Sequence, residues 1–295
     1  MYPADCPTPS GYSPSIDCDI LSGFARKQTD EVNTKQLGDT GVLLPEIGLG
    51  TWRYTGGVTP LRRGIELGAF LIDTAEAYGT EEIVGQAGQG SRDRVFIATK
   101  VSPRNFRRND VRQAADRSLQ RLRIDYIDLY QLHWPNSNIP VAETMSAMED
   151  LVDAGKVRFI GVSNFSVAEL EEARDTMTRH RIVSNQVLYN LAERDIEEDL
   201  LSYCQQRGIT VIAYSPLAKG LNNLRAADAR GVLPQIASRL GKTEAQVALN
   251  WCIAHDGVIA IPKADSIRHT EENCAASGWT LSPEDVALLE SAFPF

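Results

Sequence analysis

The chain has 295 residues, of which 43% are hydrophobic and 23% are charged, and its formal net charge is -9. This negative balance argues against a nucleic acid or an anionic membrane as the main partner, because both require a basic face. The length is compatible with two domains or with one α/β barrel, a fold that commonly exceeds about 200 residues.

The cysteines and the apolar segments bear on where the protein works. The spacing of the cysteines matches neither CxxC nor a zinc motif, which predicts reduced thiols, no metal site and a cytoplasmic location. The five are Cys6, Cys18, Cys204, Cys252 and Cys274, and a link between the first two remains open. The first residues lack the pattern of a secretory signal, and no apolar run reaches the roughly 18 residues that predict a transmembrane helix.

The N-terminal part of the chain differs from the rest in composition. Residues 1–33 are rich in Pro, Ser, Asp and Gly and have no clear period, which predicts a flexible extension. Residues 34–295 are expected to form a single domain. At its start, short apolar pieces flank Gly38-Asp-Thr-Gly41, a composition typical of a hairpin turn. Such a hairpin could close the bottom of a barrel.

Eight apolar runs that predict strands follow along the chain. They are Ile47–Thr51, Ala69–Asp73, Val95–Lys100, Ile127–His133, Arg158–Ser163, Ile182–Val187, Ile209–Ser215 and Val258–Lys263. No period of identical repeats accompanies them.

Helix signals lie between these runs. Val141, Met145, Met148 and Val152 share one helical face, and Gly155 follows where a helix would end. Two capping boxes and two pairs of a hydroxyl residue with proline predict further helix starts. The boxes are Ser166-Val-Ala-Glu169 and Thr243-Glu-Ala-Gln246, and the pairs are Thr59-Pro60 and Ser282-Pro283.

Eightfold alternation of strand and helix favours a closed (β/α)8 TIM barrel over an open doubly wound sheet, which is the alternative. Against the open sheet, Gly48-Leu-Gly50-Thr-Trp lacks the third glycine of the dinucleotide-binding fingerprint GxGxxG. The last predicted helix ends close to Phe295, so the C-terminal segment is short.

Four polar residues stand at or just beyond the carboxyl ends of three of the predicted strands, where parallel α/β folds place their chemistry. They are Asp73, Tyr78, Lys100 and His133. An ammonium beside a phenol lowers the phenol's pKa and brings its proton within range for transfer. A carboxylate would keep the ammonium charged, and an imidazole can orient an oxygen.

This set of groups suits protonation of a carbonyl oxygen while hydride reaches the carbon, which requires a nicotinamide cofactor. Each residue taken singly also has a structural interpretation. Asp73 could cap a turn, Tyr78 could be a rim aromatic, Lys100 could be solvated, and His133 could be a core histidine. The placement of all four at one end of a barrel favours the catalytic interpretation.

These residues resemble the catalytic tetrad of the aldo-keto reductase family, NAD(P)H-dependent oxidoreductases with a (β/α)8 barrel. The motifs are Ile72-Asp-Thr-Ala-Glu-Ala-Tyr-Gly79, Ala98-Thr-Lys100 and Leu132-His-Trp-Pro135, and the resemblance covers about residues 34 to 293. It implies that Tyr78 is the general acid, that Lys100 and Asp73 tune it, and that His133 orients the carbonyl.

The resemblance also implies a cofactor site for NADP(H) and possibly NAD(H). Ser163, Asn164 and Gln186 would hold the nicotinamide amide, Tyr214 would stack on its ring, and Ser215 and Leu217 would meet the pyrophosphate. The full set of implied positions is Gly50, Thr51, Ser163, Asn164, Gln186, Tyr214, Ser215, Pro216, Leu217, Ile261, Lys263, Ala264, Arg268, His269, Glu272 and Asn273. Tyr214 could instead be a core aromatic, and Ser163-Asn164 a helix cap.

The adenosine end departs from the family pattern. Ala264 stands where a hydroxyl is usual, and counting without gaps puts His269 at the usual arginine position, one residue after Arg268. Lys263 can still pair with a 2′-phosphate, so NADPH is favoured over NADH, with selectivity expected to be weaker. Asp265 would repel a phosphate if it pointed inward.

The substrate is expected to be a small carbonyl compound. Trp52 and Trp134 match aromatic pocket positions, and the short C-terminal segment predicts an open pocket for small aldehydes and α-dicarbonyls such as methylglyoxal. The chain looks most like prokaryotic methylglyoxal and general aldehyde reductases, and we expect a monomer. The alternatives are a nicotinamide-binding regulatory subunit with little turnover and a lyase in which Lys100 forms a Schiff base.

Overall fold

The computed structural model describes residues 32–293. The predicted extension therefore lies outside the described residues apart from Val32 and Asn33, and its separation from the barrel stays a prediction. Val32 is buried, and its amide donates to Leu67 O at 3.1 Å. No helix in the described part is long and apolar enough to span a membrane.

Eight parallel strands form the central sheet, and each of the eight predicted runs contains or overlaps one of them. The strands are β3 (Leu49–Gly50), β4 (Leu71–Asp73), β5 (Phe96–Val101), β6 (Ile127–Leu132), β7 (Val157–Ser163), β8 (Ile182–Leu188), β9 (Thr210–Tyr214) and β10 (Val258–Ala260). Each pairs with its neighbour in chain order. The β/α8 barrel predicted from the alternation is thus confirmed.

Hydrogen bonds between the first and last strands close the sheet. Ile47 forms a parallel bridge with Ala260. The amide of Gly48 donates to Ala260 O at 2.8 Å, and the amide of Ala260 donates to Glu46 O at 2.9 Å. An open sheet would leave these two edges unpaired, so the alternative fold is wrong.

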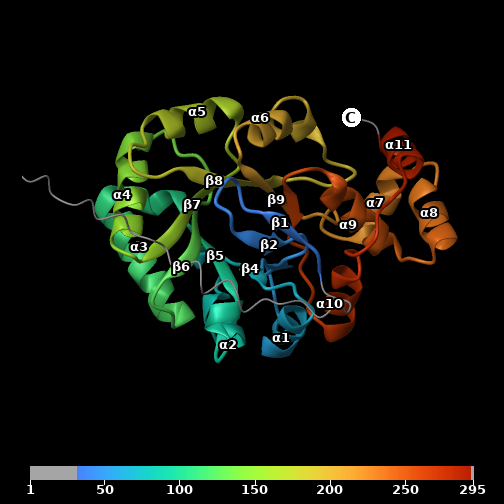
Figure 1. The fold of residues 1–295 in the computed structure, drawn as a ribbon, viewed down its shortest axis with the longest axis horizontal. Helices are drawn as coiled ribbons and strands as arrows, with labels where there is room; N and C mark the ends of the chain where they lie inside the picture. The colour runs from blue at the N-terminus through green and yellow to red at the C-terminus, as the bar shows by residue number, and fades with distance from the viewer. Residues whose placement is uncertain (1–31, 294–295) are drawn as a thin grey trace, which may run out of the picture.

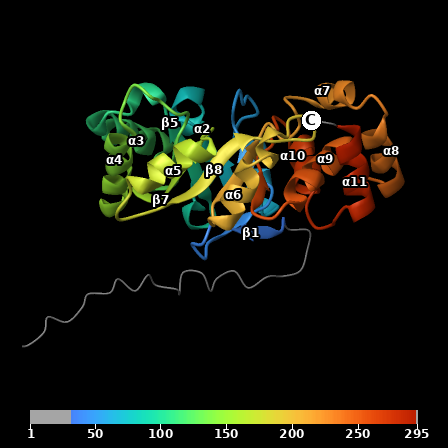
Figure 2. The same ribbon diagram turned by 90° about the horizontal axis from the view of Figure 1, so that it is seen from above.

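The predicted hairpin is also present. β1 (Thr34–Gln36) pairs antiparallel with β2 (Leu43–Pro45). The fully buried Leu37 and Leu44 join a cluster with Leu71 and Phe96 from the barrel interior. Figure 2 shows β1 beside one end of the parallel strands, so the hairpin covers the bottom of the barrel with apolar side chains.

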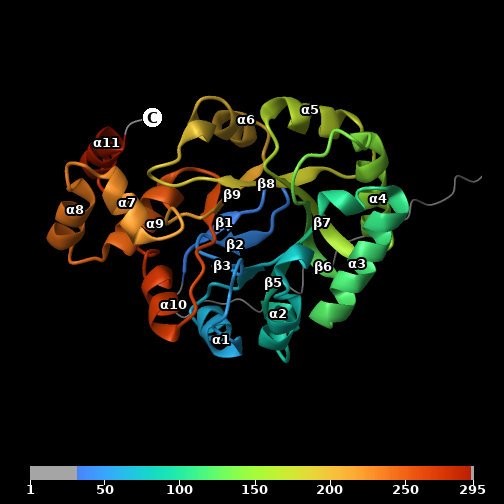
Figure 3. The same ribbon diagram turned by 180° about the vertical axis from the view of Figure 1, so that it is seen from behind.

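Helices surround the strands (Figures 1 and 3). They are α1 (Val58–Glu66), α2 (Glu81–Gly88), α3 (Arg108–Leu122), α4 (Val141–Asp153), α5 (Val167–Asp175), α6 (Leu200–Gln206), α7 (Leu221–Ala227), α8 (Val232–Leu240), α9 (Glu244–Ala254), α10 (Ile267–Cys274) and α11 (Pro283–Ala292). Short 3-10 turns include η2 (Glu76–Tyr78), η3 (Arg92–Arg94), η4 (Pro103–Asn105) and η5 (Asp195–Glu197). Figure 1 shows α7, α8 and α11 grouped at one side of the barrel.

The capping predictions are confirmed in three places and wrong in one. Both capping boxes form, at Ser166 and Thr243, and the Ser282 hydroxyl accepts from the Asp285 amide at the start of α11. α1, however, begins at Val58 after Gly57, with no side-chain cap. Thr59 therefore lies inside the first turn, because Gly57, with φ of 76°, makes the bend before the helix.

Candidate active site

The four polar residues predicted from the sequence converge at the carboxyl ends of β4, β5 and β6. Asp73 is the last residue of β4, Lys100 is the penultimate residue of β5, and His133 follows β6 directly. Tyr78 ends the 3-10 turn η2 that follows β4. Adjacent parallel strands bring their carboxyl ends to one mouth of the barrel, which explains why residues 60 positions apart in the chain can meet.

Lys100 and Asp73 form a buried ion pair. Lys100 Nζ donates to Asp73 Oδ1 at 2.6 Å and to Thr74 O at 2.9 Å. The Lys100 side chain is 0% exposed and that of Asp73 is 4% exposed. A buried ammonium needs such partners, because burial without them would cost several kcal/mol. Two of its three hydrogens are therefore committed to fixed oxygens.

The Tyr78 hydroxyl lies between the ammonium and the imidazole. Its oxygen is 3.5 Å from Lys100 Nζ and 3.3 Å from His133 Nε2. The ammonium also lies 4.9 Å from the centre of the tyrosine ring. The phenol and the imidazole are both half-buried, so they line the mouth of the barrel above the buried ion pair.

Burial governs the protonation of this cluster. It raises the pKa of the Tyr78 phenol, and the negative charge of Asp73 adds to the effect. Burial, followed by the positive charge of Lys100, lowers the pKa of His133 to about 4. Burial also lowers the pKa of Lys100, and Asp73 opposes that change. At neutral pH the site therefore holds a protonated phenol and a neutral imidazole.

The direction of the Tyr78 shift is opposite to the one expected from the sequence. The sequence predicts that Lys100 lowers this pKa. Desolvation of the half-buried phenol is instead the largest effect on its pKa, and the negative charge of Asp73 raises the pKa further. The ammonium lies within reach of the phenol oxygen, so it can stabilise a phenolate once the proton has left.

The residues expected at the nicotinamide lie at the same mouth and contact one another. Tyr214 OH donates to Asn164 Oδ1 at 3.0 Å, and Asn164 Nδ2 donates to His133 O at 3.2 Å. Ser163 Oγ donates to Gln186 O at 2.8 Å. Asn164 has a positive φ of 62°, a backbone conformation that Asn tolerates better than most residues and that is common at functional sites.

The residues expected at the pyrophosphate form a tight turn after β9. Ser215 and two residues just after Leu217, Ala218 and Lys219, all have positive φ, at 48°, 50° and 61°. Ala218 N donates to Ser215 O at 2.9 Å, and Pro216 is buried. Successive residues in turn conformations can direct their amides to one side, which suits an anion.

Gly50 and Thr51 have packing roles in the structure. A Cβ on Gly50 would stand 2.5 Å from Ile261 O, so only glycine allows this approach. The Thr51 hydroxyl is fully buried and donates to Asp73 O at 2.8 Å. Their predicted contact with the cofactor stays a prediction.

The segment expected at the adenosine end carries an internal ion pair. Lys263 Nζ pairs with Asp265 Oδ2, and Asp265 Oδ1 accepts from the Thr55 amide at 2.9 Å. Arg268 lies in hydrogen-bond contact with His269, 2.6 Å apart, and both are exposed. Asp265 is thus the ion-pair partner of Lys263, the residue predicted to meet a 2′-phosphate. The remaining expected positions in this region are Ala264 and Glu272, both partly exposed, and the buried Ile261 and Asn273.

The two tryptophans predicted for the substrate pocket are among the most exposed large apolar side chains. Trp52 is 44% exposed and Trp134 is 50% exposed. They follow β3 and β6 closely, on the side of the barrel where the tetrad lies. The Arg53 guanidinium lies 4.5 Å from the Trp52 ring centre. This exposure fits an open, partly apolar mouth.

Two polar residues at this site were missed by sequence reasoning. Gln131 is fully buried within β6 and contacts Asp73 Oδ2 at 3.4 Å. Glu76, two residues before Tyr78, accepts from Ser102 N at 2.6 Å and Asn105 Nδ2 at 2.8 Å. A glutamine inside the apolar run of residues 127–132 was the available signal for the first. The second depends on a contact between two loops, for which the sequence holds no signal.

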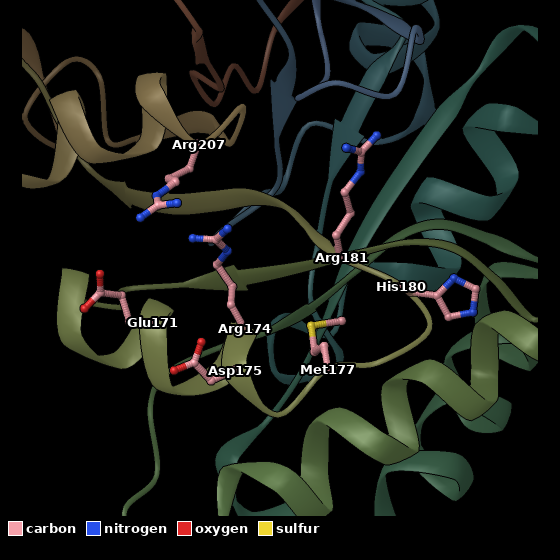
Figure 4. A pocket seen from close by; sticks show the side chains of 7 residues that line it. All are labelled: Glu171, Arg174, Asp175, Met177, His180, Arg181 and Arg207. Carbon is pink, nitrogen blue, oxygen red and sulfur yellow. The ribbon is translucent and has the colours of Figure 1, made fainter.

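A separate pocket of about 450 Å³ lies outside the barrel (Figure 4). Its lining residues come from α5, from the segment before β8 and from the end of α6, and none belongs to the tetrad. They are Glu171, Arg174, Asp175, Met177, His180, Arg181 and Arg207. His180 and Arg181 precede β8, so this pocket lies beside the amino end of that strand, opposite the tetrad.

Comparison with known proteins extends over nearly all of the described residues. The model of the aldo/keto reductase family matches residues 46–293. Methylglyoxal reductase YeaE of Escherichia coli is 44% identical over 264 residues, which cover 86% of this chain and 92% of that protein. Glyoxal reductase of Bacillus subtilis is 36% identical over 260 residues, covering 85% of this chain and 90% of that protein.

A solved structure supports the same comparison. The crystal structure of an aldo/keto reductase from Klebsiella pneumoniae in complex with NADP and acetate has a TM-score of 0.84 and 43% sequence identity to this chain. It covers 89% of this chain and 96% of that one.

Proposed function

The chain belongs to the aldo/keto reductase family and is an NAD(P)H-dependent oxidoreductase, and on that basis we propose its substrates and mechanism. It reduces small aldehydes and α-dicarbonyls, methylglyoxal among them, to alcohols with NADPH. This proposal rests on two contacts of the Tyr78 hydroxyl oxygen, which lies 3.5 Å from Lys100 Nζ and 3.3 Å from His133 Nε2.

The chain's own residues have distinct parts in the reaction. Bound NADPH would supply hydride to the carbonyl carbon. Tyr78 donates its phenolic proton to the carbonyl oxygen as that oxygen gains negative charge. Lys100 stabilises the phenolate that remains, and Asp73 holds Lys100 in its charged form. His133, neutral at neutral pH, orients the carbonyl oxygen toward the phenol.

The side-chain chemistry of the mouth fits a nicotinamide dinucleotide. Ser163, Asn164 and Gln186 offer amide and hydroxyl groups beside the tetrad, and the turn at residues 215–219 offers backbone amides. Lys263 and Arg268 supply cations for phosphate groups. The complex of the Klebsiella pneumoniae relative with NADP supports the same cofactor.

The substrate class follows from the open mouth and the relatives. Two exposed tryptophans provide apolar contact without enclosing the site, which suits small carbonyl compounds. Relatives named methylglyoxal reductase and glyoxal reductase support α-dicarbonyls in particular.

The geometry disfavours the lyase alternative. A Schiff base requires a neutral, accessible amine, whereas Lys100 is 0% exposed and paired with Asp73. Borohydride treatment in the presence of substrate is therefore expected to leave Lys100 unmodified. Trapping of an adduct on Lys100 would support the lyase instead.

A parallel rate measurement tests the proposal. Initial rates are measured with NADPH and with NADH against methylglyoxal, glyoxal and an aromatic aldehyde, by loss of the reduced cofactor's absorbance. We expect turnover with NADPH and a slower rate with NADH. Tight NADPH binding without turnover of any carbonyl would contradict the proposal and favour a regulatory subunit.

A further inference from the structure

Gln131 is a polar side chain in the interior of the barrel that the proposed mechanism leaves without a part. It lies in β6 opposite Gly161 of β7 and is fully buried. A Cβ added to Gly161 would stand 2.9 Å from Gln131 Cγ. The φ of Gly161 is not positive, so this glycine matters for space. Its missing side chain lets Gln131 lie across β7 toward β8.

Across that glycine, Gln131 joins a hydrogen-bonded triangle with Gln186 of β8 and Asp73 of β4. Gln186 Nε2 donates to Asp73 Oδ2 at 2.7 Å and to Gln131 Oε1 at 3.5 Å. Gln131 Nε2 donates to Asp73 Oδ2 at 3.4 Å. The two contacts of Gln131 are long, so each is weaker than the bond from Gln186 to Asp73.

The chemistry of the three groups fixes both amides in one orientation. An ionised carboxylate only accepts hydrogen bonds, so both glutamines turn their amino groups toward Asp73. The second hydrogen of the Gln186 amino group then points to Gln131 Oε1. Both hydrogens of the Gln186 side-chain amino group are used, and within residues 32–293 no hydrogen bond reaches its side-chain oxygen Oε1.

We propose that Gln131 is a positioning residue that holds the Gln186 amide with its carbonyl oxygen free to accept a hydrogen bond from the carboxamide N–H of the nicotinamide. This inference rests on the proposed function, which places the nicotinamide at Ser163, Asn164 and Gln186. Gln131 does not touch the cofactor. It acts through Gln186, and Asp73 links the same amide to Lys100.

The proposal separates Gln131 from a residue that only fills space. A packing residue would affect all cofactors alike, because its loss would move β6 and β8 together. A positioning residue for the Gln186 oxygen matters only to a cofactor that donates a hydrogen bond to that oxygen. The 3-acetylpyridine analogue of NADP⁺ keeps the carbonyl group and lacks the amide N–H, so it distinguishes the two roles.

The test is a cycle of two proteins and two cofactors. Gln131→Met preserves the length of the side chain and removes both polar atoms. Dissociation constants of the wild type and the variant are measured by fluorescence for NADP⁺ and for its 3-acetylpyridine analogue. We expect Gln131→Met to weaken NADP⁺ binding about three- to tenfold, the range of one lost hydrogen bond, and to leave affinity for the analogue within about twofold. Equal weakening for both cofactors, or none for either, would overturn the proposal.

Ser184→Ala provides the matched control. Ser184 lies opposite Gly161 on the other side, and its hydroxyl is buried without a hydrogen-bond partner in the described part of the chain. We expect this variant to bind both cofactors like the wild type. A selective loss of NADP⁺ affinity in Ser184→Ala as well would show a general disturbance of the layer and count against Gln131.

Steady-state rates add a second readout. Gln131→Met should raise KM for NADPH and leave kcat within about twofold, because the pair of Lys100 and Asp73 remains. A fall in kcat with unchanged KM would contradict the positioning role. The binding cycle needs no turnover, so it tests Gln131 even if no carbonyl is reduced. If the wild type reduces carbonyls but Gln131→Met does not weaken NADP⁺ binding selectively, only this inference is overturned, and the proposed function stands.

Discussion

At the residue scale, the proposed mechanism has Tyr78 and Lys100 act one after the other. Burial keeps the Tyr78 phenol protonated at rest, so it can donate a proton without first taking one up. The ammonium at 3.5 Å gains importance when the phenolate forms. In this proposal the phenol is neutral in the resting site, and the ammonium favours loss of its proton only as the reaction proceeds.

Substitutions in the ion pair of Lys100 and Asp73 are expected to affect the stability of the protein and its reaction rate differently. Lys100→Met leaves the buried Asp73 charge unpaired, and we expect a loss of about 3 to 5 kcal/mol of unfolding free energy. Adding Asp73→Asn should recover much of that stability, since the unpaired charge is gone, while the rate stays low. Urea unfolding and initial rates check this. A double variant that regains its rate would exclude a catalytic part for the ammonium.

The lowered pKa of His133 predicts that the stability of the protein depends on pH. Its pKa in the folded protein is about 4, below the ordinary 6.5. As the pH falls from 6.5 toward 4, the unfolded chain binds a proton that the folded chain does not, so stability decreases in this window. His133→Gln should therefore lose less stability than the wild type between pH 7 and pH 5. Thermal unfolding at the two pH values measures the difference, and equal losses would refute the expectation.

Asp265 is predicted to limit the preference for NADPH. Its carboxylate forms an ion pair with Lys263 and would repel a 2′-phosphate. Asp265→Asn keeps an oxygen for the Thr55 amide and removes the charge, so NADPH affinity should rise about three- to tenfold. NADH affinity should not change. Lys263→Met is the opposite control and should weaken NADPH alone, whereas an equal gain for both cofactors in Asp265→Asn would contradict the charge argument.

At the scale of elements, close approach between α2 and α3 depends on one glycine. A Cβ on Gly85 would stand 2.0 Å from Leu122 O, in the last residue of α3, whereas on Gly88 of the same helix the nearest atom would be 3.9 Å away. Gly85→Ala is therefore expected to destabilise by about 1 to 3 kcal/mol or more. Gly88→Ala should be neutral or stabilising by up to about 1 kcal/mol. Urea unfolding compares them, and similar values for the two variants would refute the packing argument.

The first residues of helices could be predicted from the sequence where the capping residue and the amide that it caps are close in the chain. Ser166, Thr243 and Ser282 cap helices as expected, because a capping hydroxyl and its amide lie within four residues of each other. The cap predicted at Thr59 does not form, because Gly57 already makes the bend before α1. The proline after Thr59 does not fix the start of the helix, since proline is tolerated in the first turn.

At the scale of the whole molecule, the barrel and the tetrad could be predicted because both follow from alternation. Eight apolar runs imply eight parallel strands, and the carboxyl ends of neighbouring strands must meet. Contacts between loops carry no such period. The hydrogen bond from the Ser102 amide to Glu76 depends on how two separate loops approach each other. The pairing of Lys263 with Asp265 depends on the path of the backbone within one loop. The sign of the Tyr78 shift likewise depended on burial, which no sequence pattern reports.

The central claim is that Tyr78 donates the proton in carbonyl reduction with NADPH. Its most direct test is Tyr78→Phe, which removes one oxygen atom, measured as kcat/KM for methylglyoxal together with the dissociation constant for NADPH. The account predicts a rate lower by about 100- to 10,000-fold, the usual range for a lost general acid, with NADPH binding within about twofold of the wild type. A Tyr78→Phe variant that reduces methylglyoxal as fast as the parent would contradict it.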